Sequence, residues 1–492
     1  MKIKYLLSMA VFGLMAAACT NDVNEVLAPE AAPQKGIPFI AIISPKSFDA
    51  TTRALTEIES EAGNFLKSEW AENETFLLVY KVGGVDQMTL ASVDKVDSDG
   101  TATIKANLKE GVTDGTSVTL NYPGDSFNAD ILAEQDGKLN DKMDVRRGTG
   151  TISVKDGKAT LEAGAKLDPL YAIVKFTLKD LWNLALALDH LIISDDEGMD
   201  VTTIKLKSGE DASSTLYAAL PEYEDKVLWF ESSDDGGGAY IAKGTANLEK
   251  GKFYTPTLKM ATEGNLMNSD GTFSTTLEEG KTPIGIIAYL GRDYTEDVTV
   301  GGGHGLVMAL KNAYGNEYWS NKLNERAYEG NDYVTKLEDL TRTTGWSGYN
   351  ATISMAAVMD GENPVHISAY YARNYSATAP EGTTGWFLPS AQQWVKMITG
   401  LGGLEESNLT WNSWFDPTYS ASKKWEEALK KAGEGNYDSI RDVELWYWTS
   451  SETSADSAVT VVVNNDSSYG LNVYGCPKYD YNRTRVRAML AF

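Results

Sequence analysis

The stretch GWFLPSAQQW, residues 385–394, decides how the last third of this 492-residue chain is expected to fold. Ser390 and Gln393 have the S-x-x-Q spacing of a capping box, in which each side chain bonds the backbone of the other at a helix start. Trp394 follows, and apolar residues with helical spacing continue one stripe after it: Met397, Ile398 and Leu401. The stretch therefore predicts the start of a helix with a buried tryptophan, and not an exposed binding edge.

The residues on either side extend this prediction. Trp386, Phe387 and Leu388 form a short extended lead-in that we expect to be packed, and Gly402–Gly403 suits the end of the helix. A second helix is predicted in SKKWEEALKKAG, residues 422–433. It repeats the apolar spacing with Trp425, Ala428, Leu429 and Ala432. Two short amphipathic helices are therefore expected in this part of the chain.

The first half of the chain has the pattern of β-strands. Apolar and polar residues alternate in TATIKANL (101–108) and in LDPLYAIVKFTLKD (167–180), which places one apolar row on a single face of each strand. Turn signals such as Gly83–Gly84 separate these runs. The pattern predicts two β-sandwich units in tandem, over 36–165 and 166–261.

A change in composition marks a further boundary. Residues 262–275 form a polar segment that we expect to be a linker, and nine of the twelve tryptophans lie beyond residue 300. A third unit is therefore expected over 276–492, a length that is ample for a core of its own.

The N-terminus has the features of an export signal. Lys2 and Lys4 precede an apolar run that ends at Ala18, and this run is shorter than the roughly 20 residues that span a bilayer. Small residues directly before Cys19 predict a lipoprotein signal peptide over 1–18, with lipidation at Cys19 and a polar tether over 19–35. The alternative is an ordinary signal peptide with an incidental cysteine. Either way, we expect the protein to be exported.

Charge and composition exclude several functional classes. The formal charge of −25, from 69 acidic and 44 basic residues, argues against nucleic-acid binding and against polybasic membrane docking. Cys476 is the only cysteine besides Cys19, so no disulfide framework is expected. The three histidines are far apart and lack metal-site spacing: His190, His304 and His366. We therefore expect no catalytic residues, no metal, no cofactor and no enzymatic activity.

Weak motifs in a consistent order extend over residues 19–261. They are TTRA (51–54), SEWAENETFLLVY (68–80), LYAALPE (216–222) and LEKGKFYTPTLKM (248–260). In this order they resemble the Bacteroidales-type fimbrillin-like family, lipoprotein-exported pilus subunits that assemble by strand exchange. The resemblance implies two transthyretin-like or Ig-like β-sandwiches. It also implies cleavage by a trypsin-like protease after an arginine in the loop that follows the first strand.

Arg53 stands where that cut would fall, which would make Ala54 the new N-terminus. Small or polar residues precede Arg53, as an exposed cleavable loop requires, and a carboxylate in a protease pocket would accept its guanidinium. Loss of the strand IPFIAII (37–43) would leave a groove that a neighbouring subunit's strand could complete. The alternative is a surface arginine that no protease cleaves, or an anchor subunit that keeps its lipid.

Five further motifs run in order through the last third of the chain. They are PIGIIAY (283–289), HGLVMALKNA (304–313), GWFLPSAQQW (385–394), YWTSSE (447–452) and VRAMLAF (486–492). This set is similar to C-type-lectin-like domains of surface lipoproteins, which are related in pattern to the Fibrobacter-type paralogous domain. The resemblance implies an α+β domain with a twisted antiparallel sheet, two helices and long variable loops. The expected fold class is thus mainly β, with two tandem sandwiches followed by this domain.

The resemblance includes enzymes of the formylglycine-generating type, which need a pair of active-site cysteines. Cys476 stands alone in the globular part, so that chemistry lacks its ligands. The calcium-site motifs Glu-Pro-Asn, Gln-Pro-Asp and Trp-Asn-Asp of sugar-binding C-type lectins do not occur either. We expect neither the oxidase activity nor a calcium site.

A ligand-binding loop is predicted between the two helices. Residues 406–422 hold aromatic side chains beside a carboxylate, a combination that stacks on a sugar ring while binding its hydroxyls: Trp411, Trp414, Asp416 and Tyr419. The alternative is that these rings cover a small core of the loop itself. The tyrosine-rich stretch YGCPKYDYNR (474–483) is a second candidate with the same alternative.

Taken together, these features predict a fimbrial tip adhesin at the cell surface, processed from an outer-membrane lipoprotein precursor. Its expected partners are other pilus subunits, joined by strand exchange, and a host or bacterial glycan or protein. Stalk subunits donate a C-terminal strand, whereas RVRAMLAF (485–492) is expected to belong to the lectin-like sheet, which favours the tip. The alternative functions are a lipid-anchored surface binding protein outside any pilus, and an anchor or capping subunit.

Overall fold

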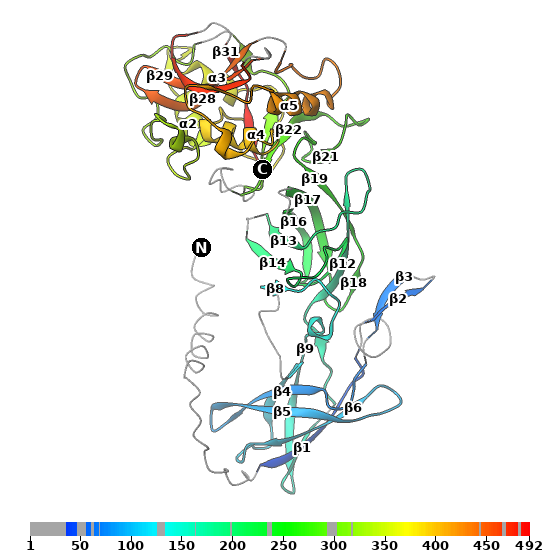
Figure 1. The fold of residues 1–492 in the computed structure, drawn as a ribbon. Helices are drawn as coiled ribbons and strands as arrows, with labels where there is room; N and C mark the ends of the chain where they lie inside the picture. The colour runs from blue at the N-terminus through cyan, green and yellow to red at the C-terminus, as the bar shows by residue number, and fades with distance from the viewer. Residues whose placement is uncertain are drawn as a thin grey trace.

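The computed structural model of the chain shows three bodies in sequence order, built mainly of β-strands (Figure 1). It describes the following residues: 36–46, 56–60, 63–67, 69–124, 133–162, 164–196, 199–233, 239–292, 303–315, 318–441, 444–464, 469–480 and 484–492. Within these ranges, no helix is long and apolar enough to cross a membrane. The mainly β prediction is confirmed.

The strands of the first body close into a ring. Its sheet has the order β10-β1-β6-β5-β4-β7-β9-β11. A further pairing of β9 with β10 closes the ring, and the two-residue strand β11 is attached to β9. The strands are β1 (Ile37–Ile43), β4 (Thr75–Val82), β5 (Val85–Val96), β6 (Ala102–Leu108), β7 (Thr116–Tyr122), β9 (Arg146–Lys155), β10 (Lys158–Leu161) and β11 (Asp168–Pro169). The predicted alternation in β6 is confirmed, because Ala102, Ile104 and Leu108 are buried. A separate hairpin pairs β2 (Thr56–Ser60) with β3 (Gly63–Lys67).

The second body is one sheet of order β15-β12-β19-β17-β16-β13-β14-β8, with β18 paired to β12. Its strands are β8 (Glu134–Gln135), β12 (Ala172–Asp180), β13 (His190–Asp195), β14 (Asp200–Lys205), β15 (Thr215–Leu220), β16 (Tyr223–Ser233), β17 (Ala239–Leu248), β18 (Phe253–Tyr254) and β19 (Thr257–Thr262). The predicted apolar row of β12 is buried in its core. β8 comes from the segment between β7 and β9, so the first body contributes an edge strand to the second sheet.

The third body combines two sheets with four helices. One sheet has the order β21-β20-β22-β23-β32 and the other the order β24-β31-β28-β29-β30-β27. The helices are α2 (Gly348–Ala356), α3 (Ile367–Arg373), α4 (Ala391–Thr399) and α5 (Ser420–Lys430). The strands are β20 (Leu266–Asn268), β21 (Phe273–Ser274), β22 (Pro283–Leu290), β23 (Gly305–Ala309), β24 (Tyr314–Gly315), β27 (Trp414–Phe415), β28 (Leu445–Ser454), β29 (Ser457–Val463), β30 (Leu471–Pro477), β31 (Thr484–Val486) and β32 (Met489–Ala491). A small hairpin pairs β25 (Met359–Asp360) with β26 (Asn363–Pro364).

The capping box at the start of α4 is confirmed in both directions. Ser390 Oγ accepts a bond of 3.2 Å from the Gln393 N–H, and Gln393 Oε1 accepts one of 2.9 Å from the Ser390 N–H. The helix ends at Thr399 with Gly400 as its C-cap, one turn before the predicted Gly402–Gly403. The carbonyl of Met397 already accepts the Gly402 N–H at 2.9 Å, so the chain has turned out of the helix by then.

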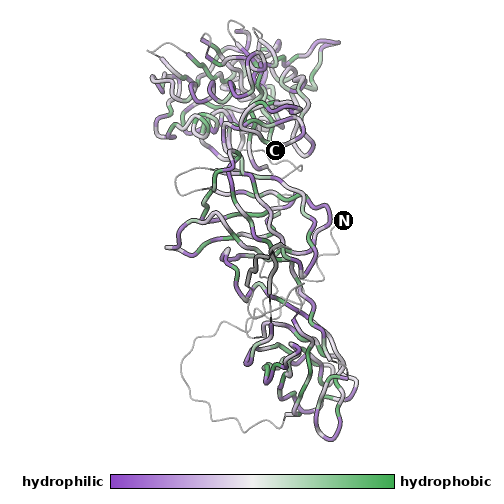
Figure 2. The backbone as a smooth tube through the Cα atoms, turned by 90° about the vertical axis from the view of Figure 1, so that its right-hand side faces the viewer, coloured by the Kyte–Doolittle hydropathy of each residue, from purple (hydrophilic) through white to green (hydrophobic). Residues whose placement is uncertain are grey.

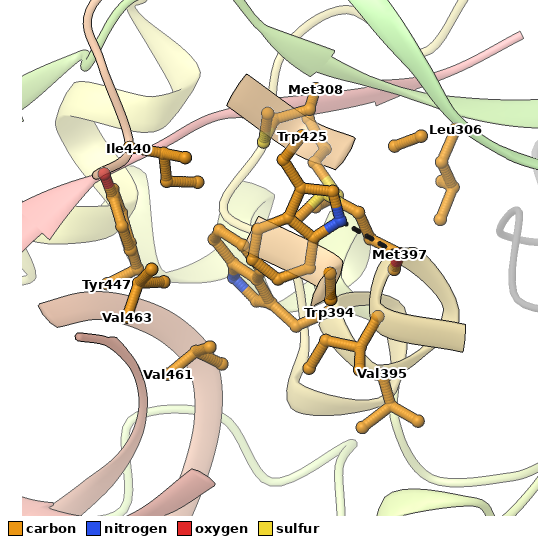
Figure 3. Packing of buried hydrophobic residues seen from close by; sticks show 14 of the residues in the cluster. Leu306, Met308, Trp394, Val395, Met397, Trp425, Ile440, Tyr447, Val461 and Val463 are labelled. Atoms are coloured by element: carbon orange, nitrogen blue, oxygen red, sulfur yellow. Dashed lines mark hydrogen bonds between the residues drawn. The ribbon is translucent and has the colours of Figure 1, made fainter. Parts of the chain in front are cut away.

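The two predicted tryptophans meet in the core between the sheets of the third body. Trp394 and Trp425 are fully buried, their ring centroids lie 6.2 Å apart, and Trp394 also packs on Tyr447 at 5.4 Å (Figure 3). Trp425 Nε1 donates to the Met397 carbonyl at 3.3 Å. Each such ring removes a large apolar area from water, so these contacts are a major source of stability.

Figure 2 shows hydrophobic and hydrophilic residues alternating along the strands of the first two bodies. Apolar side chains connect the second sheet directly to the third body. One hydrophobic cluster contains Trp229, Ile241 and Ala261 of the second sheet together with buried residues of the third body, Phe492 among them. The second and third bodies therefore share a core.

Candidate functional site

The first strand closes the ring of the first body. β1 pairs antiparallel with β6 over seven residues, from Ile37 opposite Leu108 to Ile43 opposite Ala102. On its other edge it pairs in parallel with β10, where Phe39 lies opposite Ala159. Without β1, both β6 and β10 would present an unpaired edge, which is the geometry that accepts an added strand.

The side chains of β1 alternate between core and solvent. Phe39, Ala41 and Ile43 are at most 3% exposed and belong to the core of the first body. Ile40 and Ile42 point outward and are 43% and 58% exposed. The inner row fills a strand-shaped apolar slot, because a single face of β1 supplies the three buried side chains.

The predicted processing and lipidation sites lie outside the described residues. Cys19 precedes the first described residue, and Arg53 and Ala54 fall between 46 and 56. The described chain resumes with the β2–β3 hairpin, and β3 contacts β18 of the second sheet.

The C-terminal residues are built into the third body, as expected for RVRAMLAF. β32 pairs antiparallel with β23, and Phe492 is 1% exposed. The Phe492 ring lies 5.9 Å from that of Trp229 in the second sheet. These residues fill a core position and are not available as a donated strand.

Two of the four residues predicted to bind a ligand, Trp411 and Asp416, make contacts within the protein. Asp416 is 8% exposed, and its carboxylate accepts bonds from Thr418 Oγ1 and Ser420 Oγ, both at 2.9 Å, and from the Ala421 N–H at 3.0 Å. Asp416 therefore caps the start of α5. Trp411 packs against the main core of the third body. At both positions the side chain is engaged in contacts within the third body.

The two remaining loop residues are more accessible. The half-buried ring of Trp414 lies 5.0 Å from that of Tyr469, which is 43% exposed. Tyr419 lies beneath two cations, with Lys423 Nζ at 5.1 Å and the Arg441 guanidinium at 5.0 Å from its ring centroid. The structure thus brings Trp414 to a surface pair with Tyr469, and leaves Tyr419 in a separate contact.

The tyrosines of the second candidate stretch, 474–483, also differ in how far they are exposed. Tyr474 packs edge-on against Trp446 at 5.6 Å, whereas Tyr479 is 56% exposed. Cys476 is buried, and burial, reinforced by the negative charge of Asp480, raises the pKa of its thiol to about 12. Residues 481–483 lie outside the described part.

Two features bear on metal and nucleophile chemistry. These ranges hold no group of three or more His, Cys, Asp or Glu side chains able to bind a metal ion. Ser320 Oγ and His366 Nδ1 lie 2.9 Å apart, but both residues are buried, and burial lowers the pKa of His366 to about 4. This pair has the composition of a catalytic dyad but no access for a substrate.

One face of the six-stranded sheet brings together residues that the sequence did not connect. In the register of the strands, Trp446 lies opposite Val462, Val462 opposite Asn472, and Asn472 opposite Trp414. The four positions form one row across β28, β29, β30 and β27. At one end of this row Trp446 packs against the core shared by the second and third bodies, and Val462 within the row is fully buried. Sequence reasoning missed Trp446 and Asn472, because the register of the strands, and not their spacing in the chain, makes them neighbours.

Comparison with known proteins gives remote structural likenesses. No protein-family model matches the chain, and no curated protein matches it either. A fimbrial protein from Bacteroides ovatus aligns at 15% identity over 94% of this chain and 100% of its own, with a TM-score of 0.34. A fimbrial assembly protein from Parabacteroides distasonis aligns at 9% identity over 39% of this chain and 88% of its own, with a TM-score of 0.23. At this level of likeness, the description of the fold rests on the strands and their pairing.

Proposed function

We propose that this protein is the tip subunit and adhesin of a pilus, made as a surface lipoprotein and completed by a strand from the next subunit. In this proposal, the sandwich units over 36–165 and 166–261 form the pilin-like part. The unit over 276–492 is the lectin-like adhesive domain, and β20 and β21 within residues 262–275 extend its five-stranded sheet. Lipidation at Cys19 and cleavage between Arg53 and Ala54 precede assembly.

The position of β1 is the observation that carries the proposal. β1 is the first described strand, it pairs with a neighbour on each edge, and it inserts Phe39, Ala41 and Ile43 into the core. A cut after Arg53 would free this strand together with the N-terminal tether. The slot it leaves matches an incoming strand in both backbone pairing and side-chain spacing.

The burial of the C-terminal residues supports the tip over the stalk. A stalk subunit accepts one strand and donates another, whereas residues 489–492 here are paired with β23 and packed in a shared core. Withdrawing them would expose Leu490 and Phe492, which are at most 1% exposed. The chain is thus suited to accept a strand, and its last residues are unsuited to donate one.

The runner-up is a lipid-anchored surface binding protein that never enters a pilus. It uses the same third body for binding, but it keeps Cys19 and β1. The two functions differ in the N-terminal residue of the mature surface form, which is Ala54 for the assembled protein and Cys19 for the tethered one.

The test is N-terminal sequencing by mass spectrometry of the protein recovered from sheared surface filaments, with the membrane fraction analysed in parallel. We expect Ala54 as the first residue in filaments and lipidated Cys19 in the membrane. An Arg53→Ala variant should stay in the membrane fraction, while Arg53→Lys should still be processed by a protease that accepts either basic residue. Filament material that begins only at Cys19 would overturn the proposal in favour of the runner-up.

Immunogold labelling separates the tip from the stalk and the anchor. Antibody against the third body should label filament ends away from the cell. Label along the whole filament would identify a stalk subunit, and label at the cell-proximal end an anchor.

A further inference from the structure

The segment directly after β1 carries a lysine into the first body. Lys46 lies three residues beyond Ile43, the last buried side chain of β1, and its own side chain is 3% exposed. The backbone of Ser44 holds this segment in place: its carbonyl accepts a bond of 2.8 Å from Trp70 Nε1, and its N–H donates to the Ala165 carbonyl at 2.9 Å. The lysine is therefore delivered by the same segment as the inner row of β1.

Two aromatic rings and two carboxylates surround the ammonium group of Lys46. Its Nζ lies 4.5 Å from the ring centroid of Trp70 and 4.2 Å from that of Tyr122. It donates a bond of 3.0 Å to Glu74 Oε1 and lies 3.5 Å from Asp144 Oδ2. These contacts offset the loss of water from the buried ammonium group. We call the four surrounding residues the cation socket.

The cut proposed after Arg53 would remove the lysine and leave the socket behind. Asp144 would keep an ion pair with Arg146, whose Nε lies 2.6 Å from Asp144 Oδ1. Glu74 would lose its ion pair, which in the described part of the chain is with Lys46. The Glu74 side chain is 22% exposed, so water can hydrate it while the slot is open. A neutral strand that entered the slot would displace this water and bury the carboxylate without a counter-charge.

We infer that the strand which replaces β1 carries a lysine or arginine that enters the cation socket. This strand belongs to the next pilus subunit and runs in the same direction as β1. It has apolar side chains in the places of Phe39, Ala41 and Ile43, and its basic residue follows three positions after the last of them. The inference rests on the proposed strand exchange and gives the partner a sequence requirement.

The apolar row and the cation have different roles in this recognition. Apolar side chains at every second position fit the slot in more than one register, because a shift by two residues keeps the same face inward. A cation that must meet Glu74 fits in one of these registers only. A strand with an acidic residue at this point would place a third carboxylate beside Glu74 and Asp144, where like charges repel. The socket thus selects both the register and the partner.

The first test measures strand binding by the full mature chain after it has been cut at Arg53. The probe is a fluorescent, C-terminally amidated copy of residues 36–46, GIPFIAIISPK, followed by anisotropy as it replaces the freed segment. Lys46→Met in the peptide should weaken binding at least about tenfold, whereas Ile42→Ala, at a position 58% exposed, is the control with little effect. A Glu74→Gln protein should discriminate several-fold less between the lysine and methionine peptides. Equal binding of these two peptides to the unchanged protein would overturn the inference.

The second test asks what the next subunit brings, in cells that assemble filaments. Lys46→Met with Glu74→Gln removes both charges, and Lys46→Glu with Glu74→Lys exchanges them. In both double variants the socket still matches the chain's own segment, so we expect folding and the cut after Arg53 to be retained. An incoming cation would then find no ion pair at position 74 in the neutral variant and a like charge in the exchanged one.

Incorporation into filaments should therefore fall several-fold in the neutral variant and at least about tenfold in the charge-exchanged one. Normal incorporation of the cut, charge-exchanged chain would overturn the inference. Should that chain fail to fold, the neutral variant decides in its place, and its normal incorporation would have the same meaning.

The outcomes separate this inference from the proposed function. An Ala54 terminus at filament ends, with peptides that bind equally well with and without the lysine, would support the tip subunit and reject the cation requirement. Lysine-selective peptide binding, with filament material that begins only at Cys19, would reject strand exchange and confine the socket to a role in the uncut chain.

Discussion

Replacing Phe39 with alanine should loosen the first strand far more than replacing its outward neighbour Ile42. Phe39 is 1% exposed in the core of the first body, and truncating a buried phenylalanine costs about 3–5 kcal/mol in the free energy of opening. Ile42 is 58% exposed, and a change at such a strand position costs about 1 kcal/mol or less. The two variants should therefore differ by at least about 2 kcal/mol, which is roughly a 30-fold difference in the opening equilibrium.

Hydrogen exchange followed by mass spectrometry measures this difference locally. Peptides covering β6 report on the edge that β1 protects, since all seven residues of β6 pair with it. We expect exchange in β6 to accelerate strongly in Phe39→Ala and little in Ile42→Ala, with peptides of the third body unchanged in both. Equal effects of the two variants on β6, or strong acceleration in the third body, would refute the view that the inner row of β1 closes this ring.

Three further changes test other parts of the structure. Burial raises the pKa of Glu263 to about 7, above the ordinary 4.5, so ionising this carboxyl destabilises the folded state increasingly as the pH rises from about 4.5 to 7 and beyond. Glu263→Gln should therefore stabilise the protein by about 2 kcal/mol at pH 8 and not at all below pH 4.5. Thermal unfolding at both pH values measures this difference. Asp416→Ala should remove the cap of α5 and cost about 1–2 kcal/mol in chemical denaturation, whereas Asp416→Asn should retain most of it. Maleimide labelling of Cys476 at pH 8 should be slow in the native protein and fast in guanidinium, and rapid native labelling would contradict its burial.

The elements that the sequence predicted best are those specified by neighbouring residues. The capping box of Ser390 and Gln393 and the stripes of Trp394 and Trp425 depend on spacings of three and four residues, so local chemistry determines them. The alternation in β12 follows in the same way from its period of two. The sequence did not predict that β9 would pair with β10 and close the first sheet, because that contact depends on how far the whole sheet curls.

The candidate site illustrates the same limit. The sequence shows the aromatic residues of the loop 406–422 beside a carboxylate. It does not show that the carboxylate of Asp416 accepts hydrogen bonds at the start of a helix. The row from Trp414 to Trp446 depends on the register of β28, β29 and β30, which follow one another in the chain, and of β27, which comes from the earlier loop. A one-residue slip in any strand would move its side chain to the opposite face, so sequence spacing alone could not identify this row.

Stacked rings and paired charges reinforce the shared core of the second and third bodies. The ring of Trp229 in β16 stacks on that of His304 at 4.4 Å, and Glu231 two residues later bonds His304 Nδ1 at 2.5 Å. Arg292 Nη2 adds an ion pair to Glu231 at 2.6 Å. Stacked rings and paired charges across one seam oppose rotation of the third body, because rotation would expose apolar surface and separate the charges.

Figure 1 shows the third body and β1 at opposite ends of the molecule, with the second sheet between them. In the proposed tip subunit, the strand-accepting slot lies at the opposite end of the molecule from the adhesive third body. Tension on a ligand bound by the third body would then pass through the Trp229 seam before it reached β6 and β10. Replacing Trp229 should therefore weaken adhesion under flow while leaving static ligand binding by the third body unchanged. An equal loss in both assays would show that the seam supports the binding site itself.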